Sequence, residues 1–342
     1  MYGSHDGRSG LTRAAAVAGA GAVLLLAGCS SPSAPGSQGK ESGSHGRGPG
    51  ATVPYWANPD GNAARQVAVY TANGDRKNAA LIERIARQPV GEWIGPDRPE
   101  AEAKGLTEAA ERAGREVLLV LYNIPHRDCG QFSRGGAADG QAYRAWLDGV
   151  ARGIGDRRAT VILEPDALLH MVDGCTPQEF HDERYVLLKA AVERIGRQPR
   201  TRVYLDAGNA GWRSPDALFG PLRRAGVGAA DGFAVNVANF QTTAVSTDFG
   251  KRLSAKIGGK PFVIDTSRNG NGPYVGGAPE ENWCNPPGRA LGEVPTTDTG
   301  DELVDAYLWI KRPGESDGDC RGGPKAGRWW PAYALGLARA AK

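Results

Sequence analysis

Short apolar runs alternate along this chain with longer amphipathic segments, and the pattern is clearest at residues 160–166. The run T-V-I-L at 160–163 has the continuous, β-branched apolar character of a strand that is buried on both faces. It ends abruptly at E-P-D, residues 164–166, so two carboxylates stand at the carboxyl end of a predicted core strand. Pro165 restricts its own backbone and biases Glu164 towards an extended conformation.

The same alternation continues from residue 53 to the end of the chain. Apolar runs predict strands at residues 66–70, 91–94, 117–122, 160–163, 202–206, 232–237, 261–265 and 305–310. Helical periodicity predicts helices at 76–87, 99–113, 137–154, 177–195 and 330–341. Strand and helix alternating over one uninterrupted domain predict an α/β fold with a parallel β/α barrel of TIM-like type, closed or nearly closed. An open doubly wound sheet is the alternative.

Polar residues follow several of the predicted strands. They are Tyr122, Asn123, Arg127 and Asp128, then Glu164 and Asp166, then Asp206, Asn236, Asp265 and Arg268, and finally Lys311. The carboxyl ends of barrel strands share one face, so these side chains are expected to converge on one site. Burial raises the pKa of a carboxyl group, which is what a general acid near neutral pH requires. For the Asp166 stretch alone, the alternative is an aspartate that caps the following helix.

Tryptophans accompany these polar residues in the intervening segments: Trp56, Trp93, Trp212, Trp283 and Trp309. Aromatic rings beside carboxylates and amides can hold sugar rings by stacking on their C–H faces. A tryptophan can equally be a core residue. The loop-like surroundings of Trp93, Trp212 and Trp283, with Gly, Asn and Arg, favour a ligand role for these three.

Charge and motifs exclude several classes of function. The net charge of +3 is small and evenly spread, so nucleic acid is not expected as a partner. The chain has five His and lacks the G-x-S-x-G, H-E-x-x-H and Gly-rich phosphate-loop motifs, which argues against serine hydrolases, zinc proteases and nucleotide chemistry.

The N-terminal segment indicates export. Residues 1–28 contain two arginines followed by an apolar run too short to span a membrane, and they end in L-L-A-G before Cys29. This ending is similar to a lipoprotein-type signal peptide, with Cys29 as the acylated first residue of the mature chain. An ordinary secretory peptide is the alternative. Residues 29–50, rich in Ser, Gly and Pro, are expected to be a disordered tether to a domain at residues 51–342.

Four further cysteines suit an exported protein with disulfides: Cys129, Cys175, Cys284 and Cys320. Four cysteines allow three pairings. Zinc ligation is the alternative, but no C-x-x-C pair is present, so no metal or other cofactor is expected.

Seven motifs in order resemble glycoside hydrolase family 6, from about residue 55 to the C-terminus. They are Y-N-I-P-H-R-D-C-G (122–130), I-L-E-P-D-A-L (162–168), Y-L-D-A-G-N-A-G-W (204–212), V-N-V-A-N-F (235–240), I-D-T-S-R-N-G-N-G-P (264–273), W-C-N-P-P-G-R (283–289) and L-W-I-K-R-P-G-E-S-D-G (308–318). The resemblance implies an inverting hydrolase of β-1,4-glucan. It also implies a distorted, seven-stranded barrel, which fits the predicted strands if 91–94 is not counted, and the sequential disulfides Cys129 with Cys175 and Cys284 with Cys320.

The resemblance assigns catalytic roles by motif. Asp166 is similar to the general acid, and Asp128 to the neighbouring aspartate that raises the pKa of the acid and helps to deliver water. Asp317 matches a disputed base candidate that would pair with Arg268, which would weaken it as a base. Inversion requires acid and base about 6.5–9.5 Å apart or a relay through water. Tyr122 is similar to the tyrosine that distorts the sugar ring at the cleavage point.

The resemblance also implies a set of substrate-binding residues. Ser133 matches a serine that positions water, and Asn209 stands where the family has a His, so hydroxyl binding there would not titrate. The remaining residues are expected to bind glucose hydroxyls or to stack on glucose rings: Asp206, Asn236, Lys311 and Glu315, with Trp93, Trp212, Trp283 and Trp309.

Short segments at 129–136 and 283–320 favour an open groove and internal cleavage, because chain-end enzymes of the family carry long roofing insertions. The expected protein is an exported, monomeric endoglucanase that contacts the membrane only through its anchor. The alternatives are chain-end cleavage, action on another β-glucan, and a carbohydrate-binding lipoprotein without catalysis.

Overall fold

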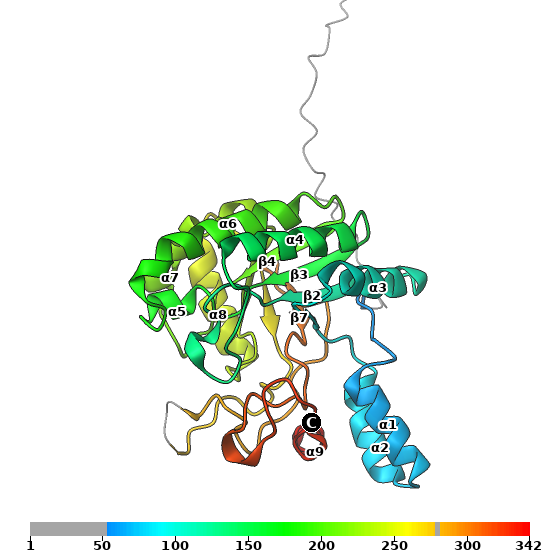
Figure 1. The fold of residues 1–342 in the computed structure, drawn as a ribbon. Helices are drawn as coiled ribbons and strands as arrows, with labels where there is room; N and C mark the ends of the chain where they lie inside the picture. The colour runs from blue at the N-terminus through cyan, green and yellow to red at the C-terminus, as the bar shows by residue number, and fades with distance from the viewer. Residues whose placement is uncertain (1–52, 278–280) are drawn as a thin grey trace, which may run out of the picture. The chain divides into compact units, whose positions relative to one another are not determined.

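The computed structural model describes residues 53–277 and 281–342, and seven parallel strands form its centre. The order in the sheet is the order in the chain: β1 (Glu92–Ile94), β2 (Val117–Leu121), β3 (Ala159–Leu163), β4 (Thr201–Asp206), β5 (Gly232–Val235), β6 (Phe262–Asp265) and β7 (Val304–Leu308). Helices cover the outside of this curled half-barrel, with α4 and α6 over β3 and β4 (Figure 1). The predicted α/β barrel-like class is confirmed, and a doubly wound sheet is excluded by the sequential strand order.

Helices connect the strands and continue to the end of the chain. They are α1 (Asn62–Ala72), α2 (Arg76–Ala86), α3 (Pro99–Arg112), α4 (Gly140–Ile154), α5 (Leu169–Val172), α6 (His181–Gly196), α7 (Pro215–Arg224), α8 (Thr243–Lys256) and α9 (Pro331–Ala340). The helix predicted from residue 137 begins at Gly140, because the side chain of Asp139 accepts a hydrogen bond from the Ala142 N–H and caps it.

The strand predicted at 66–70 is wrong, because these residues belong to α1. Val67 and Tyr70 pack with Ala63 against a small apolar cluster that includes residues of α2 and α9. This spacing of three and four residues is helical, whereas Val69, which suggested alternation, is 51% exposed. The run at 91–94, which the strand count left out, is β1 and pairs with β2 at Trp93 and Val120. The expected number of seven strands is therefore present, but the first of them is β1 and not residues 66–70.

Apolar side chains cover both faces of the sheet, as the continuous runs predict. On β2, Leu119 and Leu121 join the large core beneath the helices, while Leu118 and Val120 join the cluster inside the curl. Water is therefore excluded from both faces along the middle of the strands, and polar groups gather towards the strand ends.

The segment that follows β7 contacts Gly91 and β1 at a seam between the two edges of the sheet. The N–H of Gly91 donates to the carbonyl oxygen of Trp309 at 2.8 Å, and Nε1 of Trp93 donates to that of Ile310 at 3.1 Å. A Cβ on Gly91 would lie 2.3 Å from the Ile310 carbonyl oxygen. The seam therefore depends on the absence of a side chain at position 91.

Two disulfides tie together the segments that follow the strands. Cys129 is bonded to Cys175 and Cys284 to Cys320, which confirms the sequential pairing. Residues 1–50, with the predicted signal peptide, Cys29 and tether, lie outside the described residues. Across 53–277 and 281–342, no helix combines the length and apolar character needed to span a bilayer.

Gly91→Ala should destabilise the protein by about 1–3 kcal/mol, because the added methyl group overpacks the seam. The matched control is Gly105→Ala in α3, where a Cβ meets nothing within 4 Å. That change should be neutral or stabilise the protein by up to about 1 kcal/mol. Urea unfolding of both variants measures the difference, and equal midpoints would contradict the packing argument.

Candidate active site

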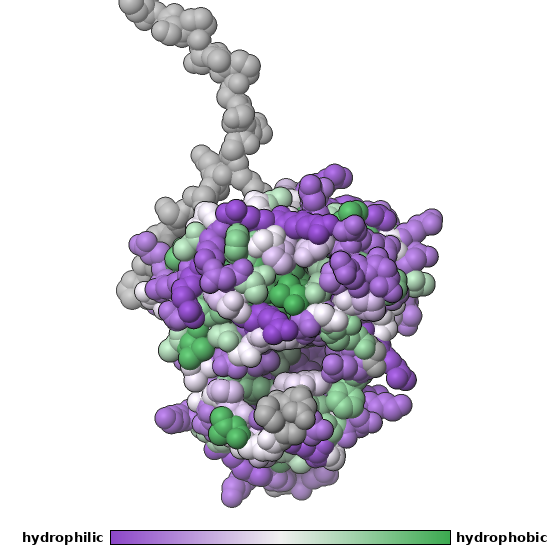
Figure 2. All heavy atoms as spheres, turned by 90° about the vertical axis from the view of Figure 1, so that its left-hand side faces the viewer, coloured by the Kyte–Doolittle hydropathy of each residue, from purple (hydrophilic) through white to green (hydrophobic). Residues whose placement is uncertain are grey.

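A groove of about 920 Å³ lies at the carboxyl ends of the strands. Figure 2 shows a recess in the middle of the face that it views. Most of the residues predicted from the sequence line this groove: Trp93, Tyr122, Asp128, Ser133, Asp166, Asn209, Trp212, Trp283, Lys311, Glu315 and Asp317. Side chains from distant parts of the chain are thus brought to one face, as the barrel predicts.

Asp166 lies at the groove, just beyond the end of β3. Its backbone has a φ of 66°, and its N–H donates to Oδ2 of Asp206 at 3.0 Å. Burial and the nearby charges of Asp206 and Asp128 raise its pKa well above the usual range for an aspartate. Asp166 therefore holds its proton more tightly than an ordinary aspartate, which is the property that a general acid needs.

Glu164 is the buried partner of Asp166 in the E-P-D motif. It accepts hydrogen bonds from the N–H groups of Asn123 and Ile124, both at 3.0 Å, and from the hydroxyl of Tyr143 at 2.8 Å. Burial raises its pKa from 4.5 to about 7. Because it holds the backbone directly after Tyr122, Glu164 fixes how the segment after β2 enters the groove.

Asp128 and Ser133 belong to a tight loop after β2. The Ser133 N–H donates to Oδ2 of Asp128 at 2.5 Å, and burial raises the pKa of Asp128. Arg127 lies over the Tyr122 ring at 4.5 Å, donates to the carbonyl of Tyr122 and donates through Nε to that of Ser133 at 2.8 Å. One guanidinium thus holds together the loop and the tyrosine.

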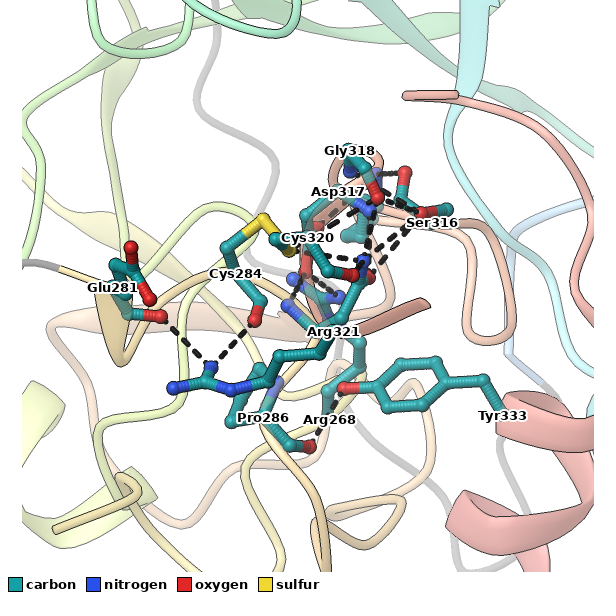
Figure 3. Close-up of a disulfide and its surroundings, with 12 residues drawn as sticks. Arg268, Glu281, Cys284, Pro286, Ser316, Asp317, Gly318, Cys320, Arg321 and Tyr333 are labelled. Carbon is teal, nitrogen blue, oxygen red and sulfur yellow. Dashed lines mark hydrogen bonds and ion pairs between the residues drawn. A yellow bond between two sulfur atoms is a disulfide. The ribbon is translucent and has the colours of Figure 1, made fainter. Parts of the chain in front are cut away.

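Asp317 has the opposite electrostatic setting. Burial opposes its charge, but Arg268 at 2.8 Å and Lys311 at 3.5 Å lower its pKa below the usual range. The N–H of Asn285 also donates to its Oδ2 at 3.0 Å. Figure 3 shows Asp317 beside Arg268 and the Cys284–Cys320 disulfide. Asp317 is therefore held as an anion, which makes it a weak base.

Four predicted site residues lie behind the groove wall: Asp206, Asn236, Arg268 and Trp309. Trp309 is 1% exposed and donates through Nε1 to the carbonyl of Glu293, so the prediction that it stacks on a sugar is wrong. Asn236 hydrogen-bonds the backbone of Gln241 and Asp265 instead of facing the groove. Arg268 acts through Asp317, and Asp206 through the backbone of Asp166.

The tryptophans divide as their sequence surroundings indicated. Trp93, Trp212 and Trp283 line the groove, whereas Trp56 packs against the main core. Nε1 of Trp212 donates to Asp173 at 3.0 Å, which fixes the orientation of the indole. Trp283 lies 6.0 Å from the ring of Phe132, which comes from the loop after β2, so side chains from separate loops touch at this point.

Sequence patterns did not reveal several other residues that line the groove: Phe132, His170, Asp173, Tyr274 and Arg312. His170 follows Asp166 by four residues and packs edge-on to Trp212 at 5.3 Å. Burial lowers its pKa to about 4, so the imidazole is neutral at ordinary pH. Its helical spacing from Asp166 was a usable signal. Phe132 and Tyr274 lie in loops, where periodicity carries no information.

Asp265 also organises the site without lining it. Its carboxylate accepts hydrogen bonds from the N–H groups of Ala238, Ser267, Ile310 and Lys311. The segments after β5, β6 and β7 therefore converge on one buried acid. The sequence placed Asp265 at a strand end but did not reveal this role.

One group of potential metal ligands occurs in the described part of the chain: Cys129, His170 and Cys175. The two sulfur atoms are bonded to each other, so neither is available as a thiolate ligand.

Comparison with known proteins identifies the family. The profile "Glycosyl hydrolases family 6" matches residues 51–341, and the chain belongs to this family. It is 44% identical over 298 residues to Endoglucanase A from Cellulomonas fimi, covering 86% of this chain and 63% of that protein. It is 42% identical over 291 residues to Endoglucanase 1 from Streptomyces halstedii, covering 82% and 87%.

Solved structures agree with this assignment. The endoglucanase Cel6 from Mycobacterium tuberculosis, in complex with methyl-cellobiosyl-4-deoxy-4-thio-β-D-cellobioside, superposes with a TM-score of 0.79 at 45% identity, covering 85% of this chain and 98% of that one. The catalytic core of the cellobiohydrolase Cel6A from Chaetomium thermophilum gives 0.71 at 26% identity, covering 85% and 97%. The chain spans less than two thirds of the C. fimi protein.

Glu164→Gln should flatten the dependence of stability on pH. Between pH 4.5 and about 7 the folded protein retains a proton on Glu164 that the unfolded chain has released, so the free energy of unfolding falls as pH rises. Removing this titration should reduce the fall by roughly 3 kcal/mol. Denaturant unfolding at several pH values across this window measures it.

The exposed Glu193→Gln on α6 is the matched control and should keep the wild-type slope. If both variants keep that slope, Glu164 does not titrate as stated.

Proposed function

We propose that this protein hydrolyses internal β-1,4-glucosidic bonds of cellulose or a related β-glucan with inversion, and that Asp166 is the general acid. The observation that carries the proposal is Asp166 at the groove, with a pKa that burial and the neighbouring charges of Asp206 and Asp128 raise well above the usual range. A carboxyl group that holds its proton more tightly than an ordinary aspartate is what a general acid requires.

Asp166 donates its proton to the glycosidic oxygen as the bond to the anomeric carbon breaks. Asp128 lies close enough to raise the pKa of Asp166, which favours the protonated form of the acid before the reaction. The attacking water approaches the opposite face of the sugar, and Asp128 and Ser133 are suited to hold it while the proton that it loses passes through further water molecules to solvent. Asp317 is too strongly held by Arg268 to act readily as the base.

The groove offers groups for both faces of a glucose ring. Trp93 packs edge-to-face on Tyr122 at 5.6 Å, which places two aromatic rings beside the acid. We assign Tyr122 to distorting the sugar at the cleavage point, and Trp212 and Trp283 to stacking. Oδ1 of Asn209 accepts from the Gly211 N–H, so its Nδ2 can donate to a hydroxyl. Lys311 and Glu315 complete the polar edge.

Internal cleavage is favoured over chain-end cleavage by the relatives named endoglucanases at 42–44% identity. The segments around the groove are also short. Phe132 bridges towards Trp283 by a side-chain contact and is itself 45% exposed. An internal stretch of polymer can enter when one such contact opens, whereas a long roofing loop would require threading from an end.

Export and anchoring complete the proposal. Residues 1–28 would be removed as a lipoprotein-type signal peptide, Cys29 would carry the lipid, and residues 29–50 would tether the domain at 51–342. The sequence of the N-terminal segment supports this assignment. Monomeric behaviour stays a prediction.

Asp166→Ala should lower kcat on unactivated glucan about 10²–10⁴-fold, because the leaving oxygen loses its proton donor. The assay follows the viscosity of carboxymethylcellulose against reducing ends released by the purified protein. A steep fall in viscosity for few ends supports internal cleavage, and release of ends without that fall contradicts it. Near-wild-type turnover of Asp166→Ala would refute the assignment of the acid, and Asp156→Asn, an exposed acid, serves as control.

Asp173→Asn should shift the alkaline fall of kcat/KM to lower pH. The charge of Asp173 contributes to raising the pKa of Asp166, and the reaction requires Asp166 to be protonated. Removing that charge lowers the pKa, so activity is lost earlier as pH rises. The single amide oxygen of asparagine can still accept the Trp212 hydrogen bond, but the Cys175 N–H then loses its acceptor. An unchanged alkaline limb would mean that another group controls it.

A further inference from the structure

A second hollow, of about 280 Å³, adjoins the groove on the side of α1 and α2. Arg312 lines both the groove and this second hollow. Nδ2 of Asn62, in the second hollow, donates at 2.8 Å to Oε1 of Glu315, in the groove. The two spaces therefore share a wall that includes Arg312 and the Asn62–Glu315 pair.

The lining of the second hollow combines amides with apolar surface. Asn58, Asn62 and Gln88 supply amides, and Trp329 and Leu106 supply apolar surface. This combination suits a sugar, whose hydroxyl groups take hydrogen bonds and whose C–H faces need apolar contact. The volume lies just below the usual range for ligand pockets, about 300–1,000 Å³, so it suits one ring better than an oligosaccharide.

The charges around the second hollow favour an uncharged ligand. Arg312 is engaged by Glu92 at 3.2 Å and by Glu315 at 3.0 Å, and Arg65 donates to Asn62 at 2.6 Å. Asp60, Glu92 and Glu102 also line the hollow and outnumber its two arginines, so it has little positive charge to offer a phosphate or a carboxylate. A neutral, hydroxyl-rich molecule meets no electrostatic penalty there.

The walls of the second hollow are held in place before any ligand arrives. Nε of Arg312 donates to the carbonyl of Gly91 at 2.8 Å, and Nδ2 of Asn58 donates to Glu92 at 2.9 Å. Nε1 of Trp329 donates to Gln66 at 3.1 Å. In contrast, the amide of Gln88 makes no hydrogen bond to another side chain or backbone group among the described residues, so it is available to a ligand.

We propose that the second hollow is an additional subsite that binds one glucosyl unit of the same β-1,4-glucan chain that occupies the groove, the chain passing over Arg312. The inference rests on the proposed function, because it assumes a glucan in the groove. Longer chains would then gain contacts with Gln88, Asn58 and Trp329 that shorter chains cannot reach.

The test uses Gln88→Trp, which fills the second hollow, in the full-length chain. The control is Gln178→Trp, the same change at an exposed position that lines neither space. Affinities for cellooligosaccharides from cellotriose to cellohexaose are measured by calorimetry in an Asp166→Ala background, and kcat/KM is measured for the same series with Asp166 present. Gln88→Ala, which only deletes the free amide, is the second variant if the tryptophan impairs folding.

In the parent protein, affinity should rise roughly fivefold at the chain length that first reaches the second hollow, as expected for about one added hydrogen bond. Gln88→Trp should abolish this step, Gln88→Ala should reduce it, and neither should alter affinity for shorter chains. If Gln88→Trp folds and follows the same length profile as Gln178→Trp, the subsite does not exist, although hydrolysis still stands. If no oligosaccharide is bound or cleaved at any length, the proposed function itself fails.

Discussion

Desolvation of carboxyl groups at the strand ends is the constraint on which the rest of the groove depends. Glu164, Asp206 and Asp265 are almost completely removed from water, and burying an acid is unfavourable unless donors surround it. The donors here are mainly backbone N–H groups at the starts of the segments that follow the strands. Each buried acid therefore specifies the path of the chain into the site.

The same desolvation produces opposite chemistry at two aspartates. Asp166 has other carboxyl groups as neighbours, and its N–H binds Asp206, so burial and like charge both favour its protonated form. Asp317 is also buried, but Arg268 and Lys311 reverse the outcome. The two side chains are identical, so the difference comes entirely from the charged groups that the fold places beside each one. Several of these residues also have positive φ, including Glu164 and Asp166, so the polar ends of the strands carry strain that the packed strand bodies maintain.

Much of this arrangement could be predicted from sequence, for reasons that particular residues make plain. Strands β2 and β3 are continuous apolar runs. A polar residue directly after such a run lies at the face formed by the carboxyl ends of the strands in a parallel barrel. Residues 66–70 misled because Val67 and Val69 alternate like a strand, while Ala63, which lies one helical turn before Val67, falls outside that short window. Trp309 misled because it stands two residues before Lys311, a spacing that would put both side chains on one face of a strand, but β7 ends at Leu308 and the alternation does not continue past it. Phe132, Tyr274 and the seam around Arg312 depend on contacts between distant segments, which no local pattern encodes.

The sequential order of the strands has a consequence for how the molecule assembles. Each strand from β1 to β7 pairs with its neighbour in the chain, so most of the sheet can form by successive short-range steps. The seam differs, because the contact between Trp93 and Ile310 joins residues 217 positions apart. Forming this contact costs a large loop-closure entropy, and the contact adds little stability until the chain between the two residues has folded. Trp93 and Lys311 stand on its two sides, so a chain released or cut before its last hundred residues have folded would possess Asp166 yet lack the surface that holds a substrate against it.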